Sequence, residues 1–205
     1  MKGALVLAGG KSTRFGSDKA LARLGEKPLI IHVIEMALNL ADEVVVAIGR
    51  EDNAVVYRKL LPTSVTLVKD RLHAKSPLVG MVGGLQLMKS GYAMVLSCDT
   101  PFAKDDVLRF LFKRAGHSDA VIPKWPNGDI EPLQAVYRVK SAIPAARFAL
   151  HRQEFRLVDM IKRLNSVTYV PVREIKRIDA NLVTFFNINT QSGLRHAAAI
   201  YASQR

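Results

Sequence analysis

Cysteine is almost absent from this chain of 205 residues. The one cysteine, Cys98, has no partner within the chain, so no intramolecular disulfide can hold the fold together. Such low cysteine usage is typical of proteins from a reducing compartment, and we expect a cytoplasmic protein. Cys98 ends the run V-L-S-C, which predicts a small buried side chain rather than a nucleophile.

Long apolar runs are also absent. No stretch approaches the roughly 20 apolar residues that a membrane-spanning helix needs. The apolar stretch near the N-terminus is broken by Gly9 and Gly10, which leaves it too short for the core of a signal peptide. We therefore expect a soluble protein without a membrane partner.

Acidic residues are scarce relative to basic ones. The chain has 18 Asp and Glu against 30 Lys and Arg, a formal net charge of +12, which favours anionic partners. The basic residues are scattered, aromatic residues make up only 7% of the chain, and no recognised nucleic-acid motif is present. A basic nucleic-acid-binding module therefore ranks last among the functional hypotheses, and we expect no specific nucleic-acid partner. The five histidines show neither metal-ligand spacing nor a catalytic triad pattern.

Apolar runs alternate with amphipathic stretches along the chain. Buried strands are predicted at residues 3–8, 43–48, 65–68, 92–97, 119–123, 132–139, 167–172 and 183–186. Helices are predicted at residues 29–38, 78–87, 104–114 and 155–164. This alternation predicts an α/β protein in which residues 1–205 form a single domain. We expect a doubly wound, mostly parallel, Rossmann-like sheet with a small antiparallel element after the turn at Asn127-Gly128.

The first predicted strand runs into the loop L-A-G-G-K-S-T-R-F-G-S-D-K at residues 7–19. Glycine has no Cβ, so the backbone of such a loop can approach a polyanion closely. A Walker loop is excluded, because Arg14 and Phe15 stand five positions beyond Gly9 and Gly10. The glycine spacing also fails the dinucleotide-binding pattern. The loop is therefore predicted to bind phosphate in another way.

Five further motifs follow this loop. They are Asp70, S-P-L-V-G at 76–80, S-C-D-T-P-F at 97–102, E-P-L-Q-A-V-Y at 131–137 and N-I-N-T at 187–190. In this order, and over nearly the whole chain, the motifs resemble the MobA-type nucleotidyltransferases, the molybdenum cofactor guanylyltransferases. The resemblance implies an enzyme that moves GMP from GTP to the phosphate of molybdopterin and releases pyrophosphate.

The resemblance places the nucleotide beside the first loop. It implies nucleotide contacts by Leu7, Ala8, Gly9, Gly10, Lys19, Asp70 and Asp99. Arg14 and Lys19 would neutralise the triphosphate as pyrophosphate departs. Asp99 matches the aspartate of the family's C-D-x-P motif and would bind Mg²⁺, with Mn²⁺ as the alternative metal. Arg14, Lys19 and Asp99 are thus the predicted catalytic residues, although an aspartate before a proline-started helix also serves as an N-cap.

The acceptor side is implied by the resemblance at Gly80, Arg156, Asn187 and Asn189. Arg156 lies in a basic amphipathic segment whose simpler interpretation is a solvated helix face. Asparagine after a strand also serves to accept a left-handed turn. The sequence does not choose between Asn187 and Asn189.

The base of the nucleotide and the identity of the acceptor leave a second functional hypothesis open. L-A-G-G resembles the guanylyl side of the family, whereas cytidylyl relatives usually have L-A-A-G. Ser76, Phe15 and the absence of asparagine in V-V-V-A-I-G-R depart from the family pattern. A related NTP transferase acting with another base or on another acceptor (cytidylyl, cobinamide-phosphate or sugar-phosphate) is the second hypothesis. If the first is right, GTP and molybdopterin are the substrates, and we expect transient contact with molybdoenzyme maturation proteins.

Overall fold

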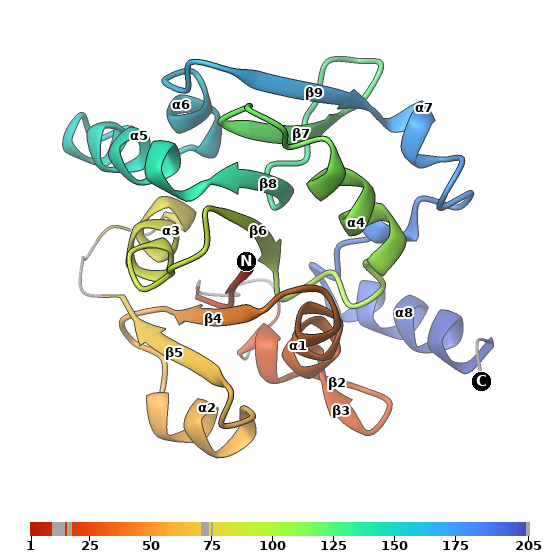
Figure 1. Cartoon of the computed structure of the whole chain (residues 1–205). Helices are drawn as coiled ribbons and strands as arrows, with labels where there is room; N and C mark the ends of the chain where they lie inside the picture. The colour runs from red at the N-terminus through yellow and green to blue at the C-terminus, as the bar shows by residue number, and fades with distance from the viewer. Residues whose placement is uncertain (10–14, 16–17, 71–73, 75, 204–205) are drawn as a thin grey trace.

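The computed structural model describes residues 1–9, 15, 18–70, 74 and 76–203 (Figure 1). The first half contains β1 (Lys2–Leu7), the 3-10 helix η1 (Lys19–Leu21), β2 (Arg23–Leu24), β3 (Lys27–Pro28), α1 (Leu29–Leu40), β4 (Glu43–Ile48), α2 (Ala54–Leu60), β5 (Val65–Lys69), α3 (Pro77–Leu85) and β6 (Tyr92–Ser97). The second half contains α4 (Asp105–Lys113), β7 (Ala120–Lys124), β8 (Gln134–Arg138), α5 (Val139–His151), α6 (Leu157–Ile161), β9 (Val167–Pro171), α7 (Val172–Ile175), the 3-10 helix η2 (Val183–Phe185) and α8 (Gln191–Ser203).

Seven of the described strands form one sheet in the order β5-β4-β1-β6-β8-β7-β9. Strands β5, β4, β1 and β6 are parallel, and β7 is parallel to β9. Strand β8 runs antiparallel to both of its neighbours, β6 and β7. Strand β7 therefore points the same way as β6, so the carboxyl ends of every strand except β8 lie at one edge of the sheet. The predicted mostly parallel sheet with an antiparallel element is confirmed. The short hairpin β2–β3 stands apart from it.

Helices cover both faces of the sheet (Figure 1). One face packs its apolar side chains against α1 and α4, and the other packs against α3, α5 and α6. Strand β1 lies inside the sheet between β4 and β6, where both of its faces are covered, and its residues from Gly3 to Leu7 are all buried. Continuous apolar runs are what strands covered on both faces require, which explains why β1 and β4 were predicted correctly. Within the described residues no helix is both long and apolar enough to span a bilayer.

The strand predicted at residues 183–186 is wrong. Val183–Phe185 forms a 3-10 turn instead, and it follows Leu182, whose backbone is left-handed with φ 51°. The carboxylate of buried Asp179 accepts a hydrogen bond from the backbone N–H of Thr184 at 2.8 Å. This side-chain bond closes the segment into a turn, an outcome that a β-branched and aromatic composition does not reveal.

Candidate active site

The edge of the sheet at which the parallel strands end gathers most of the sequence motifs. The backbone N–H of Cys98 donates to the carbonyl of Leu7 at 3.1 Å, which joins the ends of β6 and β1. The N–H of Asp70 donates to the carbonyl of Ile48 at 3.0 Å, which joins the ends of β5 and β4. Ligand sites of open α/β sheets lie outside this edge, and we call it the carboxyl edge.

Close backbone packing explains the first glycine of the predicted phosphate loop. A Cβ added to Gly9 would lie 2.5 Å from the backbone nitrogen of Gly49, which follows β4. No larger residue fits there without moving the backbone, so Gly9 fixes where the loop leaves β1. Gly10 and Arg14 lie outside the described residues, and their roles remain predictions.

Three motifs meet at the ammonium group of Lys19. Its Nζ lies 2.6 Å from Oδ2 of Asp99 and donates to Oδ1 of Asn189 at 3.1 Å. The N–H of Ile188 also donates to the carbonyl of Asp99 at 2.9 Å, which holds the 187–190 segment beside β6. The structure therefore brings together the loop, the aspartate and the late asparagine segment. The direct ion pair between Lys19 and Asp99 was not predicted.

A second set of contacts holds the backbone around Lys19. The Oδ1 of Asp18 accepts from the N–H of Ala20 at 3.1 Å and caps η1. Its Oδ2 accepts from the hydroxyl of Tyr57 at 2.8 Å, a side chain on α2 that is fully buried. Burial, followed by the hydrogen bond to Asp18, raises the pKa of Tyr57, so the phenol stays a donor. Sequence reasoning missed Tyr57 because α2 was not predicted, and it missed the capping role of Asp18 because the short helix η1 was not predicted.

The carboxylate of Asp99 has one oxygen engaged and one unengaged. Oδ2 meets Lys19, while buried Oδ1 has no hydrogen-bond partner among the described residues. A buried carboxylate oxygen without a partner is costly unless a ligand completes it. Mg²⁺ characteristically binds one or two carboxylates and completes its shell with water and substrate phosphates. Asp99 therefore fits such an ion, although no group of three or more His, Cys, Asp or Glu side chains in the described part of the chain could hold a metal alone.

Asp70 is a second carboxylate with an unpartnered oxygen at this edge. Its buried Oδ1 has no hydrogen-bond partner among the described residues. Burial, with a smaller contribution from the negative charge of Asp52, raises the pKa of Asp70 to about 6. Its Oδ1 lies 3.9 Å from the place that a Cβ would take on Gly80 or on Gly83. The glycines of α3 thus leave room beside this carboxylate.

The remaining predicted residues differ in their surroundings. Gly80 packs tightly, because a Cβ there would lie 3.1 Å from the Leu7 side chain. Asn187 donates from Nδ2 to the carbonyl of Phe185 within its own turn, at 3.2 Å, so only Asn189 of the two asparagines contacts Lys19.

Arg156 is exposed just before α6. Its neighbour Phe155 accepts a hydrogen bond from the Ser76 hydroxyl at 2.7 Å, which ties this segment to the start of α3.

Comparisons with known proteins agree with this architecture. The model of the MobA-like NTP transferase domain matches residues 4–167. A probable molybdenum cofactor guanylyltransferase of Methanosarcina mazei is 32% identical over 200 residues, covering 95% of this chain and 89% of that protein. Another from Pyrococcus furiosus is 34% identical over 195 residues, covering 93% of each.

Among solved structures, the molybdopterin-guanine dinucleotide biosynthesis protein A of Archaeoglobus fulgidus is similar with a TM-score of 0.84. It is 29% identical, and the match covers 99% of this chain and 100% of that one. The match of the family model to residues 4–167, the same fold and identity above 30% across almost the whole length lead to one conclusion. This chain belongs to the MobA-like NTP transferase family.

Proposed function

We propose that this protein transfers GMP from GTP to the terminal phosphate of molybdopterin and releases pyrophosphate. The observation that carries the proposal is the cluster of Lys19, Asp99 and Asn189, in which three family motifs meet at the carboxyl edge. The transferred group and the acceptor are taken from the names of the similar proteins, a probable molybdenum cofactor guanylyltransferase and a molybdopterin-guanine dinucleotide biosynthesis protein.

The reaction requires one bond to form and one to break. An oxygen of the acceptor phosphate attacks the α-phosphorus of GTP, and the bond from that phosphorus to the bridging oxygen of the β-phosphate breaks. The electron pair leaves with pyrophosphate. A phosphate monoester is already ionised near neutral pH, so the attack needs no general base. The protein contributes positioning and charge neutralisation.

Lys19 and Asp99 divide this work between them. Asp18 and Tyr57 hold the backbone around Lys19 at the end of the loop, and the Lys19 ammonium would meet the phosphates and offset their charge. Asp99 would hold Mg²⁺, or Mn²⁺, through the oxygen that has no partner among the described residues. When bound, the ion would supply charge neutralisation at the triphosphate. Without substrates, each side chain neutralises the other, which keeps two opposite charges stable in a partly buried site.

The other predicted residues surround this pair. We assign the backbone of Leu7, Ala8, Gly9 and Gly10 and the side chain of Asp70 to the nucleotide, and Arg14 to the triphosphate. Asn189 is the preferred asparagine on the acceptor side because its amide contacts Lys19. Gly80, Arg156 and Asn187 complete the proposed acceptor side.

The setting of the enzyme is part of the proposal. Residues 1–205 act as a single nucleotidyltransferase domain in the cytoplasm. The dinucleotide product then passes to molybdoenzyme maturation proteins by transient contact.

Calorimetric titration with GTP, CTP, ATP and UTP in the presence of Mg²⁺ tests the base. We expect selective binding of GTP. With GTP and molybdopterin together, equal amounts of pyrophosphate and dinucleotide should form. Selective CTP binding would instead assign the protein to a cytidylyl-type reaction, and the absence of binding by any nucleotide would overturn the proposal.

A further inference from the structure

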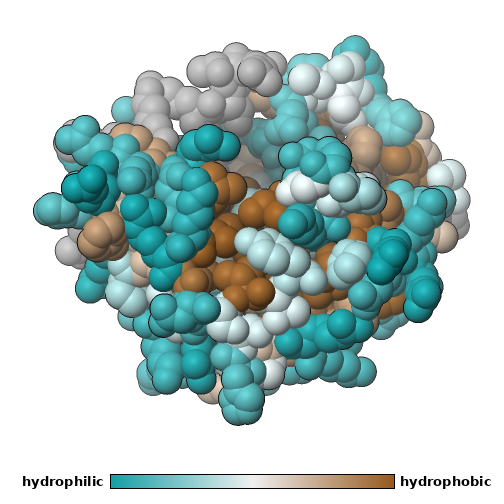
Figure 2. Space-filling model, turned by 90° about the horizontal axis from the view of Figure 1, so that it is seen from above, coloured by the Kyte–Doolittle hydropathy of each residue, from teal (hydrophilic) through white to brown (hydrophobic). Residues whose placement is uncertain are grey.

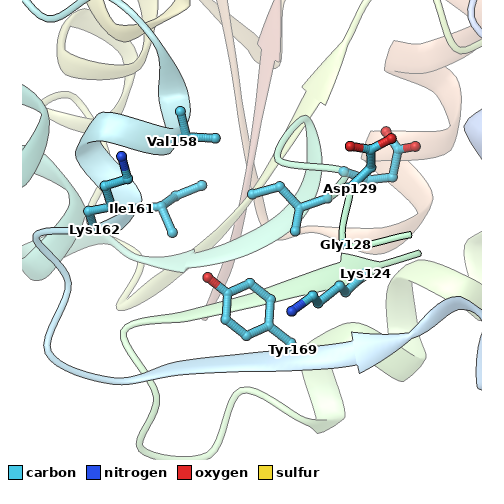
Figure 3. Close-up of a pocket in the computed structure, with 9 residues that line it drawn as sticks. Lys124, Gly128, Asp129, Val158, Ile161, Lys162 and Tyr169 are labelled. Atoms are coloured by element: carbon cyan, nitrogen blue, oxygen red, sulfur yellow. The ribbon is translucent and has the colours of Figure 1, made fainter. Parts of the chain in front are cut away.

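A cavity of about 580 Å³ lies between α6, β9 and the loop that joins β7 to β8. Its volume is in the range of small-molecule binding sites. Figure 3 shows Val158 and Ile161 of α6 on one side, with Lys124 and Tyr169 on the neighbouring strands. From the side of the molecule on which β9 lies in Figure 1, the surface is hollowed and exposes hydrophobic residues between hydrophilic ones (Figure 2).

The lining of the cavity reaches the same edge of the sheet as the reaction centre. Strand β7 is parallel to β6, so Lys124 at the end of β7 lies at the edge where Asp99 follows β6. Gln134 at the start of β8 is fully buried and donates from Nε2 to the hydroxyl of Thr100, next to Asp99, at 3.2 Å. Three residues before Gln134 stands Glu131, which lines the cavity. Three residues span at most about 10 Å, which is the reach of a small two-ring substrate.

The lining combines apolar side chains with charges of both signs. Ile130, Val158 and Ile161 supply aliphatic walls. The ammonium of Lys124 lies 5.1 Å from the ring centre of Tyr169, and Lys162 adds a second positive charge. Such a lining suits a planar heterocycle that belongs to an anionic molecule.

Glu131 supplies the group that can read such a heterocycle. Its Oε1 accepts from the indole N–H of Trp125 at 2.7 Å, which fixes the carboxylate in place and leaves Oε2 outside that hydrogen bond. Burial raises the pKa of Glu131, and the indole hydrogen bond partly offsets that effect. A carboxylate in a partly buried site pairs well with two adjacent N–H donors. The 2-amino-4-oxo-pyrimidine edge of a pterin offers that pair.

We infer that this cavity holds the pterin ring of the acceptor and that the Glu131 carboxylate accepts hydrogen bonds from its 2-amino-4-oxo-pyrimidine edge. The inference rests on the proposed function and adds to it the binding site of the acceptor's ring. Guanine has the same 2-amino-4-oxo-pyrimidine group as a pterin. In the sheet, however, β6 and β8 separate β7 and β9 from β1, which leads into the nucleotide loop. The pterin is therefore the occupant.

Neopterin monophosphate, a fluorescent pterin with a phosphate side chain, is the probe. We expect the wild-type protein to bind it and Glu131→Gln to weaken binding at least tenfold, because the amide keeps an acceptor for Trp125 but loses the charge. Val158→Phe, which fills the cavity, should weaken binding similarly. Glu26→Gln, at an exposed carboxylate, is the matched control and should change nothing. Thermal melting of each variant reports whether it is folded.

The outcomes separate the inference from the proposed function. Unchanged pterin binding in both cavity variants, or no binding by the wild type, overturns the inference. If GMP displaces neopterin monophosphate as effectively as a second pterin does, the cavity binds guanine, and this result also overturns the inference. If the wild type transfers GMP but Glu131→Gln keeps its KM for molybdopterin, the inference alone fails. If pterin binding depends on Glu131 but no GMP is transferred, the proposed function alone fails.

Discussion

Two aspartates at opposite edges of the sheet are equally buried and differently satisfied. Asp99 and Asp119 each expose 6% of their surface. Asp119, just before β7, accepts from the hydroxyl of Ser141 at 2.6 Å and from the backbone N–H of Asn165 at 3.0 Å, one on each oxygen. Asp99 has Lys19 on one oxygen and no partner among the described residues on the other.

The difference separates a carboxylate that holds the fold from one that awaits a ligand. The hydrogen bond from Ser141, opposed by burial but helped by the backbone N–H groups, lowers the pKa of Asp119. Its charge is therefore stabilised by the native structure itself. At Asp99 the native structure leaves part of that task undone, which is the state expected of a group that binds metal or substrate.

The same substitution at both positions gives the sharpest contrast, and the largest effect is expected at Asp99. Asp99→Asn should lower kcat by about a hundredfold to a thousandfold, the scale of losing one electrostatic group in an active site. Its free energy of unfolding should fall by about 1 kcal/mol, because the amide keeps an oxygen for Lys19 but no longer neutralises its charge, while the ammonium keeps some access to water. Pyrophosphate release and urea unfolding measure the two quantities. Unchanged turnover would remove Asp99 from the reaction.

Asp119→Asn should do the reverse. An amide cannot accept hydrogen bonds on both sides, so a backbone N–H or the Ser141 hydroxyl loses its acceptor, at a cost of about 2–3 kcal/mol. The kcat of the folded fraction should stay at the wild-type value. Because the native pKa is lowered, the difference in stability is full near neutral pH and shrinks as the pH falls below the ordinary aspartate value of about 3.9. Urea unfolding at several pH values checks this, and loss of kcat in the folded protein would contradict the comparison.

A smaller effect is expected at the partner of Asp99. Lys19→Met keeps the aliphatic stem but removes the charge, and it should weaken GTP binding about tenfold to a hundredfold, the scale of a charged hydrogen bond. Calorimetric titration with GTP and Mg²⁺ measures it. Lys27→Met is the matched control, because Lys27 pairs with Glu35 on the exposed surface. An equal loss in both variants would show a general charge effect rather than a site at Lys19.

The sequence predicted the parts of the fold that depend on local pattern. The runs at Glu43–Ile48 and Tyr92–Ser97 became β4 and β6 with the predicted limits, because strands covered on both faces need uninterrupted apolar residues. The helices α2, α5 and α8 were not predicted. Helix α5 contains Pro144, a residue that normally argues against a helix interior.

The site was predicted as a set of positions but not as a set of contacts. The motifs placed Lys19, Asp99 and Asn189 near the ends of strands, and the parallel sheet brings those ends together. The contacts of Tyr57 with Asp18 and of Trp125 with Glu131 join side chains that no local pattern relates. Such contacts depend on how helices and loops pack after the sheet has formed, and single-sequence periodicity carries no information about that step.

Asp70 tests whether a buried oxygen without a partner at the carboxyl edge always belongs to a residue that serves function and lowers stability. Its native pKa of about 6 is above the ordinary aspartate value of about 3.9, so the native state binds the proton more tightly than the unfolded chain. The contribution of Asp70 to stability therefore falls as the pH rises from about 4 to about 6, and it stays at its lowest above that. Asp70→Asn cannot ionise. It should raise the melting temperature by a few degrees at pH 8 and by almost nothing at pH 4.

The same variant should bind GTP more weakly if Asp70 contacts the nucleotide, so stability and binding would move in opposite directions. Titration with GTP at pH 7.5 measures the second quantity. Asp42→Asn is the control, since Asp42 accepts a backbone hydrogen bond from Lys2 at the amino edge and faces no nucleotide. If Asp70→Asn is more stable at pH 8 yet binds GTP normally, the buried carboxylate of Asp70 lowers the stability of the protein and has no role in nucleotide binding. Burial without a partner would then mark function only where, as at Asp99, a cation such as Lys19 shares the group.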